Sequence, residues 1–359
     1  MRIGYLLDLN KGGYDQPLPD REDVHDTLEA MIQEALVAEE AGFHSIGISD
    51  RHGRTEVYWP GPMQFLTILA RETKKVALGT YCLVQTLWHP MLIAEQTAVA
   101  DNLSRGRFFQ CPGRGYHSGY WDYFGIPQER MLGRFLEGVR CLEQAFESRG
   151  RPFTFDGEFY QVWNQMLSPQ PWQDHVPIWG TGQAPAAIKR AASYADSWAG
   201  DPFPLEKATW DRELGAYREA ATAEGKEPYV ILMRDGWVAD SYEEAMEEFG
   251  TNYLDEVRFY ARHGIVTHHP DFQHEDDFTP EATREHLVMG SAEECIAQIE
   301  KYREEYGVDY IMMRFRMTNG PSFEAVREQI RRFGAEVCAH FHDLYPPPEH
   351  PAIPEGARW

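Results

Sequence analysis

The chain has 359 residues, of which 43% are hydrophobic and 13% aromatic, so it is long enough to bury a sizeable core. Its 34 lysines and arginines are outnumbered by 57 aspartates and glutamates, and the formal charge of −23 argues against nucleic acids and anionic membranes as partners. The five cysteines form no CxxC pair, and the first apolar run, residues 3–7, is too short for a signal peptide, so we expect reduced thiols and a cytoplasmic location.

Short apolar runs alternate along the chain with longer segments of helical periodicity, a pattern typical of a parallel sheet whose strands are buried on both faces. The predicted strands are residues 2–9, 45–49, 76–84, 107–111, 176–179, 197–199, 230–239 and 309–317. The predicted helices are residues 24–41, 63–73, 91–103, 128–148, 184–195, 205–224, 242–262 with 292–306, and 323–341. Eight strand-then-helix units predict an α/β fold, a (β/α)8 TIM-like barrel occupying residues 1–342.

Three segments depart from this alternation. Residues 150–175 alternate with period two around Asp156-Gly157, which predicts a small β insertion after the fourth helix. Residues 263–290 are too long and polar for a barrel connection, so we expect a loop or lid before the last helix–strand unit. Residues 343–359 are rich in proline and predict an extended C-terminal arm.

Unusual residues follow the fourth and fifth predicted strands, where a barrel carries its chemistry. Arg114 stands between Gly113 and Gly115, and a guanidinium can grip a phosphate through two hydrogen bonds. The turn Gly180-Thr181-Gly182 precedes a predicted helix, whose free N–H groups favour an anion. The alternatives are an ion pair between Arg114 and a carboxylate, and a simple strand-to-helix turn.

Four stretches in order, residues 38–52, 74–116, 156–198 and 290–310, resemble the bacterial luciferase-like flavin-dependent oxidoreductases. The resemblance covers nearly the whole chain. It implies a TIM-like barrel, FMN or the deazaflavin F420 lying across the strand ends, and usually a homodimer.

The resemblance also implies roles for individual residues. The residue that matches Arg114 grips the flavin phosphate, and Tyr81-Cys82 matches a non-prolyl cis peptide beneath the flavin ring. At Ala184 and Ala187 the luciferases carry hydroxyl residues, so Thr181 and backbone amides would have to bind more of the phosphate here. Cys111 is expected in the core. The expected cofactor site comprises Asp50, Tyr81, Cys82, Gly113, Arg114, Gly115, Tyr116, Gly180, Thr181, Gly182, Gln183 and Ala184.

One departure from the family concerns the catalytic base. The luciferases have an acid followed by two histidines after the second strand, whereas this chain has Asp50-Arg51-His52, and Arg51 cannot act as a base near neutral pH. The aldehyde chemistry of the luciferases is therefore in doubt. The candidates for moving a proton are His52, His117 and His89, each of which has a structural histidine as its alternative.

Aromatic residues cluster in the loops predicted at the same end of the barrel. Tyr58, Trp59, Tyr120 and Trp121 are the expected walls of an apolar substrate pocket, with loop packing as the alternative. The histidine-rich residues 268–277 lack a familiar ligand spacing, so we expect no metal.

Together these features predict a two-component FMN-dependent monooxygenase. Reduced FMN would arrive from a separate flavin reductase, and O2 would react through a C4a-peroxyflavin to oxygenate a small apolar organic substrate. One alternative is an F420-dependent hydride-transfer oxidoreductase of the same fold, although a charge of −23 suits its polyglutamyl tail poorly. The other is a non-catalytic flavin-binding protein.

Overall fold

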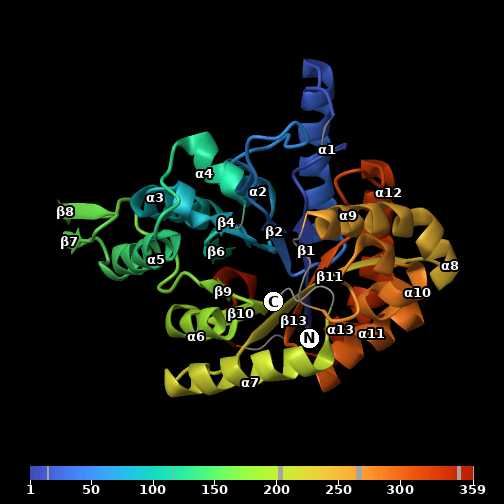
Figure 1. The fold of residues 1–359 in the computed structure, drawn as a ribbon. Helices are drawn as coiled ribbons and strands as arrows, with labels where there is room; N and C mark the ends of the chain where they lie inside the picture. The colour runs from blue at the N-terminus through green and yellow to red at the C-terminus, as the bar shows by residue number, and fades with distance from the viewer. Residues whose placement is uncertain (14–15, 116, 201–204, 264–268, 346–348, 359) are drawn as a thin grey trace.

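The computed structural model describes residues 1–13, 16–115, 117–200, 205–263, 269–345 and 349–358 (Figure 1). Eight parallel strands pair in the order β5-β3-β2-β1-β13-β11-β10-β9. The Gln110 N–H donates to Pro177 O at 2.9 Å and its carbonyl accepts from Trp179 N at 2.7 Å, which joins the two edge strands and closes the barrel. The barrel strands are β1 (Arg2–Leu7), β2 (Ser45–Ile48), β3 (Ala77–Thr80), β5 (Phe108–Phe109), β9 (Trp179–Thr181), β10 (Ser197–Gly200), β11 (Val230–Val238) and β13 (Tyr310–Arg314).

Each strand overlaps one of the eight runs predicted from the sequence, although β9 shares only Trp179 with the run predicted at 176–179, and the reason for the agreement is burial. Nearly every strand position is buried, as expected for strands with side chains on one face inside the barrel and on the other under helices. Inside the barrel, the Phe109 and Trp179 rings stack at 3.9 Å between centroids. The barrel prediction is confirmed.

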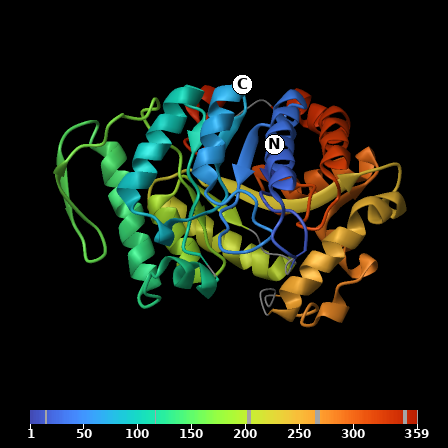
Figure 2. The same cartoon turned by 90° about the horizontal axis from the view of Figure 1, so that it is seen from above.

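Helices surround the strands on the outside (Figure 2). The segment predicted as one helix at 242–262 runs through a π-helical turn between α8 and α9, and the segment at 323–341 does the same between α12 and α13. The longer helices are α1 (Arg21–Glu40), α2 (Pro62–Glu72), α3 (Pro90–Ser104), α5 (Met131–Glu147), α6 (Pro185–Tyr194), α7 (Lys207–Ala223), α9 (Thr251–Arg262), α11 (Ala292–Glu305) and α12 (Phe323–Phe333). The shorter elements are η1 (Gln85–Leu87), α4 (Ser118–Phe124), α8 (Tyr242–Ala245), η2 (Met246–Gly250), η5 (Gly334–Cys338) and α13 (Ala339–Leu344).

The predicted insertion forms an antiparallel hairpin, β7 (Phe153–Asp156) with β8 (Gln161–Gln165), that projects at the left of Figure 1. The predicted lid segment is more structured than its composition indicated. Beyond residues 264–268, which lie outside the described residues, it contains η3 (Glu275–Asp277), α10 (Pro280–Thr283), η4 (Arg284–His286) and β12 (Val288–Gly290), and β12 pairs with the end of β11.

The C-terminal arm is docked rather than free. Ala352, Ile353 and Ala357 are buried in the same cluster as the residues inside the barrel. The Trp179 indole donates to Ala352 O at 2.8 Å, and Arg2 Nη1 donates to Ala357 O at 3.0 Å. Because Arg2 opens β1, the arm lies against the end of the barrel where the strands begin, which leaves the carboxyl ends of the strands as the mouth.

None of the helices in the described part of the chain combines the length and the apolar composition that crossing a membrane requires.

Candidate active site

Asp50 bonds to the segment of residues 81–88 that follows β3, which we call the floor of the mouth. It lies two residues after the end of β2, and its side chain is completely buried. Its Oδ2 accepts from Val84 N at 3.0 Å and from the Trp88 indole at 3.3 Å, while its own N–H donates to Cys82 O at 3.1 Å. The Tyr81-Cys82 peptide at the start of this segment is cis, as the family resemblance implied.

His52 is the histidine that this floor positions. Its Nε2 lies 2.8 Å from Asp50 Oδ1, and its side chain is only 6% exposed. The Phe124 ring stands edge-on to the imidazole at 5.0 Å between centroids. The imidazole and the carboxylate are close enough to form an ion pair when His52 is protonated, so this pair is a candidate for moving a proton.

The other two candidate histidines have structural contacts. His117 Nδ1 accepts from Gly119 N at 3.1 Å and caps α4, and His89 Nδ1 accepts from Met91 N at 3.2 Å and caps α3. Both side chains are exposed. Their contacts match the structural alternative, so His52 is the one of the three that is buried beside a carboxylate.

Arg114 and the start of α6 are the two places at which the sequence predicts a bound phosphate. The Arg114 side chain is exposed, and no carboxylate within the described ranges pairs with it, which removes the ion-pair alternative. The N-cap of α6, Ala184, offers no side-chain hydrogen bond, and the first turn has no acidic residue. The strands β6 (Pro112–Gly113) and β9, which lead into the two places, contact one another. A guanidinium and uncapped N–H groups on one side of the mouth fit the phosphate of a flavin nucleotide.

The glycines of this region serve the protein's own packing. A Cβ at Gly113 would lie 3.2 Å from the Cβ of Cys82, and one at Gly115 would lie 2.8 Å from a methyl of Val84. In the fifth-strand turn, a Cβ at Gly180 would lie 2.7 Å from Ala195 and one at Gly182 would lie 2.9 Å from Ala187. The absence of a side chain at these four positions lets the neighbouring segments approach one another closely.

The other predicted cofactor residues fall on the same rim. Gln183 and Ala184 are exposed at the start of α6, and Thr181 is half-buried at the end of β9. Tyr116 lies outside the described residues. Cys111 is fully buried, as expected for a core residue, and its Sγ lies 3.5 Å from that of Cys82.

The four predicted substrate aromatics are engaged in packing. The Tyr58 hydroxyl donates to Asp23 Oδ2 at 2.6 Å, and the Trp59 ring meets Phe65 edge-on at 4.6 Å. Tyr120 is buried, and the Trp121 indole donates to Thr86 Oγ1 at 2.9 Å. These contacts match the packing alternative.

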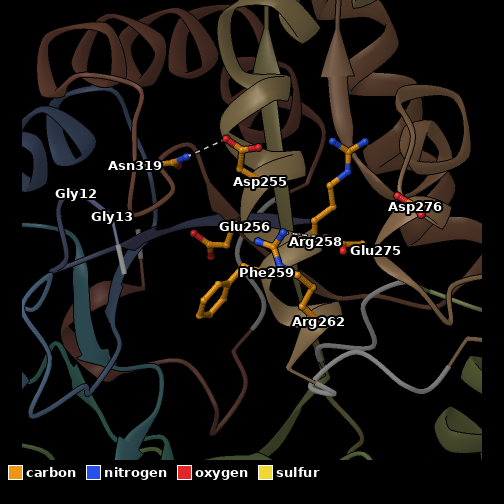
Figure 3. A pocket seen from close by; sticks show the side chains of 10 residues that line it. All are labelled: Gly12, Gly13, Asp255, Glu256, Arg258, Phe259, Arg262, Glu275, Asp276 and Asn319. Carbon is orange, nitrogen blue, oxygen red and sulfur yellow. Dashed lines mark hydrogen bonds and ion pairs between the residues drawn. The ribbon is translucent and has the colours of Figure 1, made fainter. Parts of the chain in front are cut away.

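The structure contains a cavity of about 630 Å³ that the sequence analysis did not find (Figure 3). Arg51 Nη2 donates to Tyr260 Oη at 3.4 Å, and the Arg54 guanidinium lies 5.9 Å from the centre of the Phe259 ring, so the loop after β2 contacts α9 at the cavity. The lining residues are Gly12, Gly13, Asp255, Glu256, Arg258, Phe259, Arg262, Glu275, Asp276 and Asn319.

The walls of this cavity are charged, and some of the charges are already paired. Arg262 Nη1 lies 2.8 Å from Glu275 Oε2, as Figure 3 shows, and Glu256 lies 3.0 Å from Arg314 Nη1. Arg258 donates only to the Phe278 carbonyl, at 2.7 and 3.2 Å, among the residues described. Arg258 therefore brings an unneutralised positive charge to a wall that also carries an aromatic ring.

The buried Arg314 fixes α9 to the barrel. Its Nε lies 2.6 Å from Asp235 Oδ1 on β11, while its Nη1 contacts Glu256 on α9. Burial opposes the charge on Arg314, but Asp235 and Glu256 outweigh it and hold the pKa of this arginine well above its usual value. The cavity wall formed by α9 is consequently anchored to two strands.

A parallel barrel with a buried His52–Asp50 pair and an uncapped helix start at its mouth is a TIM-like barrel. Residues 1–310 match the luciferase-like monooxygenase family, and the chain belongs to that family. Its members bind flavins and include both monooxygenases and other oxidoreductases.

Several known proteins are similar over most of the chain. The oxygenase component of the flavin-dependent trigonelline monooxygenase of Acinetobacter baylyi is 25% identical over 341 residues, 90% of this chain and 92% of that protein. The crystal structure of the monooxygenase RslO1 from Streptomyces bottropensis superimposes with a TM-score of 0.81 at 24% identity, over 95% of this chain and 100% of that one.

Relatives with different cofactors occur among the matches. The oxygenating constituent of 3,6-diketocamphane monooxygenase from Pseudomonas putida, in complex with FMN, gives a TM-score of 0.77 at 16% identity, over 94% of this chain and 98% of that one. An F420-dependent glucose-6-phosphate dehydrogenase of Nakamurella multipartita is 28% identical over 201 residues, 54% of this chain and 58% of that protein.

Proposed function

We propose that the protein is the oxygenase component of a two-component monooxygenase that uses reduced FMN and O2. One observation carries this proposal. Arg114, which no described carboxylate neutralises, and the uncapped start of α6 both lie at the mouth that also holds the His52–Asp50 pair. The first arrangement suits the flavin phosphate and the second suits proton transfer. The Acinetobacter relative, named an oxygenase component, supports a separate reductase as partner.

The chain's own residues would bind the flavin, orient it and move the proton of the substrate. Reduced flavin, when bound, would supply the electrons with which O2 is activated. Arg114 and the amides after Thr181 would hold the phosphate, and the cis Tyr81-Cys82 segment would support the ring. His52 would accept a proton from the substrate or return one, and the Asp50 carboxylate beside the ring would stabilise the protonated imidazole.

The charged cavity is the basis of our proposal for the substrate class. The sequence predicted an apolar substrate, but the walls of this cavity carry Arg258, Asp255 and Asp276 around the Phe259 ring. We propose that the substrate is a small ring compound that carries a charged group, with the ring on Phe259 and a carboxylate on Arg258.

An F420-dependent oxidoreductase is the second candidate, because F420-dependent dehydrogenases of the same family match this chain. The two candidates differ in the electron carrier and in the use of oxygen. Binding of reduced FMN and of reduced F420 should be measured in parallel by fluorescence titration without O2. Saturable binding of FMN followed by substrate-dependent oxygen uptake supports the proposal, whereas binding of F420 alone would replace it with hydride transfer.

We also propose a homodimer that buries one face of α2 and α3. Ile68 on α2 and Leu92, Val99 and Leu103 on α3 are large apolar side chains with exposed fractions of 38 to 45%. The two helices pack side by side, so these residues form one apolar stripe. Light scattering should give twice the chain mass for the wild type and a monomer for Val99→Asp.

A further inference from the structure

The Cys82 and Cys111 thiols form a close pair inside the mouth. Their sulfur atoms are 3.5 Å apart, and they come from neighbouring segments that follow β3 and β5. We propose that this pair is an oxidation site at which a peroxide converts the two thiols to a disulfide beneath the cofactor site.

The backbone brings the two cysteines within range of a disulfide. Leu83 N donates to Cys111 O at 2.9 Å, and Cys111 N donates to Thr80 Oγ1 at 2.9 Å, so the two segments lie side by side. Backbones hydrogen-bonded in this way are about 5 Å apart, inside the range of about 4.4 to 6.8 Å that disulfides span between Cα atoms. Closing the sulfur–sulfur gap to about 2.05 Å then takes a side-chain rotation rather than a movement of a strand.

Gly113 provides the space for that rotation. A Cβ built there would lie 3.2 Å from the Cβ and 4.0 Å from the Sγ of Cys82, so a larger residue would press on this side chain. The Cys82 side chain therefore borders a position without a side chain on one side and the Cys111 thiol on the other.

The two thiols differ in access, which sets the order of events. Cys82 is half-buried, whereas Cys111 is fully buried. Burial, and then the neighbouring Cys82, raise the pKa of Cys111 well above its usual value, so Cys111 stays a thiol while Cys82 meets the oxidant. Cys82 is the attacking group and Cys111 the resolving group.

The chemistry balances with one peroxide for each pair. The Cys82 sulfur attacks hydrogen peroxide, the O–O bond breaks, and Cys82 sulfenic acid and one water form. The Cys111 sulfur then attacks the Cys82 sulfur, its proton leaves with the departing hydroxide as a second water, and the S–S bond forms. Two thiols are oxidised and one peroxide is reduced to two waters.

The cross-link would alter the floor that supports the cofactor. Cys82 follows the cis peptide, and its carbonyl accepts the Asp50 N–H, so a bond to Cys111 ties this segment to the strand beside it. Slower oxidation in the presence of flavin is a consequence that rests on the proposed function. The cross-link itself does not depend on it.

The test uses the full chain without flavin. The protein is treated with millimolar hydrogen peroxide under native conditions, then denatured, alkylated and analysed by intact mass and peptide mapping. We expect two of the five thiols to become resistant to alkylation, a peptide pair linked through Cys82 and Cys111, and full recovery with dithiothreitol. The buried Cys141, Cys295 and Cys338 serve as internal controls that remain alkylated.

Variants separate the two roles. Cys111→Ser should leave Cys82 as a sulfenic acid that a dimedone probe traps, whereas Cys82→Ser should lose no thiol; Cys141→Ser should behave as wild type. Five free thiols in treated wild type, a different linked pair, or Cys82 oxidised beyond the sulfenic acid while Cys111 stays free would overturn the proposal. Because these readouts need no flavin, they stay readable whether or not flavin binds.

Discussion

His52 Nε2 lies 2.8 Å from Asp50 Oδ1, and the same carboxylate accepts hydrogen bonds from the Val84 backbone and the Trp88 indole. One buried aspartate thus connects the candidate proton carrier to the segment that follows the cis peptide. His52 is positioned by the floor of the mouth and not by its own loop alone.

Replacing His52 by asparagine should lower turnover by about a hundredfold or more, the contribution typical of a positioned general acid or base. Affinity for reduced FMN should stay as in wild type, because the predicted phosphate contacts lie elsewhere. Steady-state oxygen uptake with the coupled product measures the first quantity and anaerobic titration the second. His117→Asn, which replaces an exposed N-cap histidine by another residue that can cap the helix, is the control. Equal turnover in the two variants would remove His52 from the reaction.

Arg258→Gln tests the charged cavity. The variant should weaken binding of ring compounds that carry a carboxylate by about 1.5 to 3 kcal/mol, since a hydrogen bond to a charged group is lost, and should leave their uncharged analogues unaffected. Calorimetric titration gives both affinities. The matched control is Arg140→Gln, an exposed arginine on α5 that also donates to a backbone carbonyl. Loss of affinity for charged and uncharged ligands alike would show a structural effect instead.

His286 predicts how stability depends on pH. Burial, followed by Arg234 and His269, lowers the pKa of His286 from 6.5 to about 4. The unfolded chain therefore takes up a proton below pH 6.5 that the folded chain does not. Above pH 6.5 the titration of His286 does not change the free energy of unfolding. As the pH falls from 6.5 to about 4, it lowers this free energy by about 3 kcal/mol in all.

His286→Gln keeps an acceptor for the Leu205 N–H and removes the titration. Urea unfolding between pH 4 and 6.5 should show a flatter dependence in this variant than in wild type. His25→Gln, at an exposed position, should follow the wild-type curve. Parallel curves for wild type and His286→Gln would contradict the assignment.

Ile353→Ala tests the docked arm. Ile353 is 3% exposed among residues that also line the barrel, so the variant should lose about 2 to 5 kcal/mol of unfolding free energy. Glu349→Ala, at an exposed position of the same arm, should lose almost none. If urea unfolding gives equal stability for the two variants, the arm is not part of the core.

The barrel could be predicted from the sequence because its eight strands are short apolar runs buried on both faces, with turn residues between them. The strand β12 was missed because its three residues, Val288–Gly290, border the capping box of α11 and carry little pattern of their own. The docking of the arm was missed because small residues such as Ala352 and Ala357 do not show whether a proline-rich segment is free or packed.

The candidate site was predicted where the family motif specifies backbone and missed where it depends on loop packing. The cis Tyr81-Cys82 peptide and the buried Cys111 are confirmed. Composition could not show that Tyr58 bonds Asp23 or that Trp59 packs on Phe65, because those partners are distant in the sequence. The charged cavity depends on the relation of α9 to the loop after β2, which no local pattern encodes.

The central claim is that Arg114 and the start of α6 hold the phosphate of a flavin nucleotide. The most direct measurement compares the affinities of reduced FMN and reduced riboflavin, which differ by the phosphate, in wild type and in Arg114→Ala. We predict that wild type prefers FMN by at least about tenfold and that the variant loses most of this preference while its affinity for riboflavin is unchanged. Equal affinities for the two flavins in wild type, or the same preference in the variant, would contradict the account.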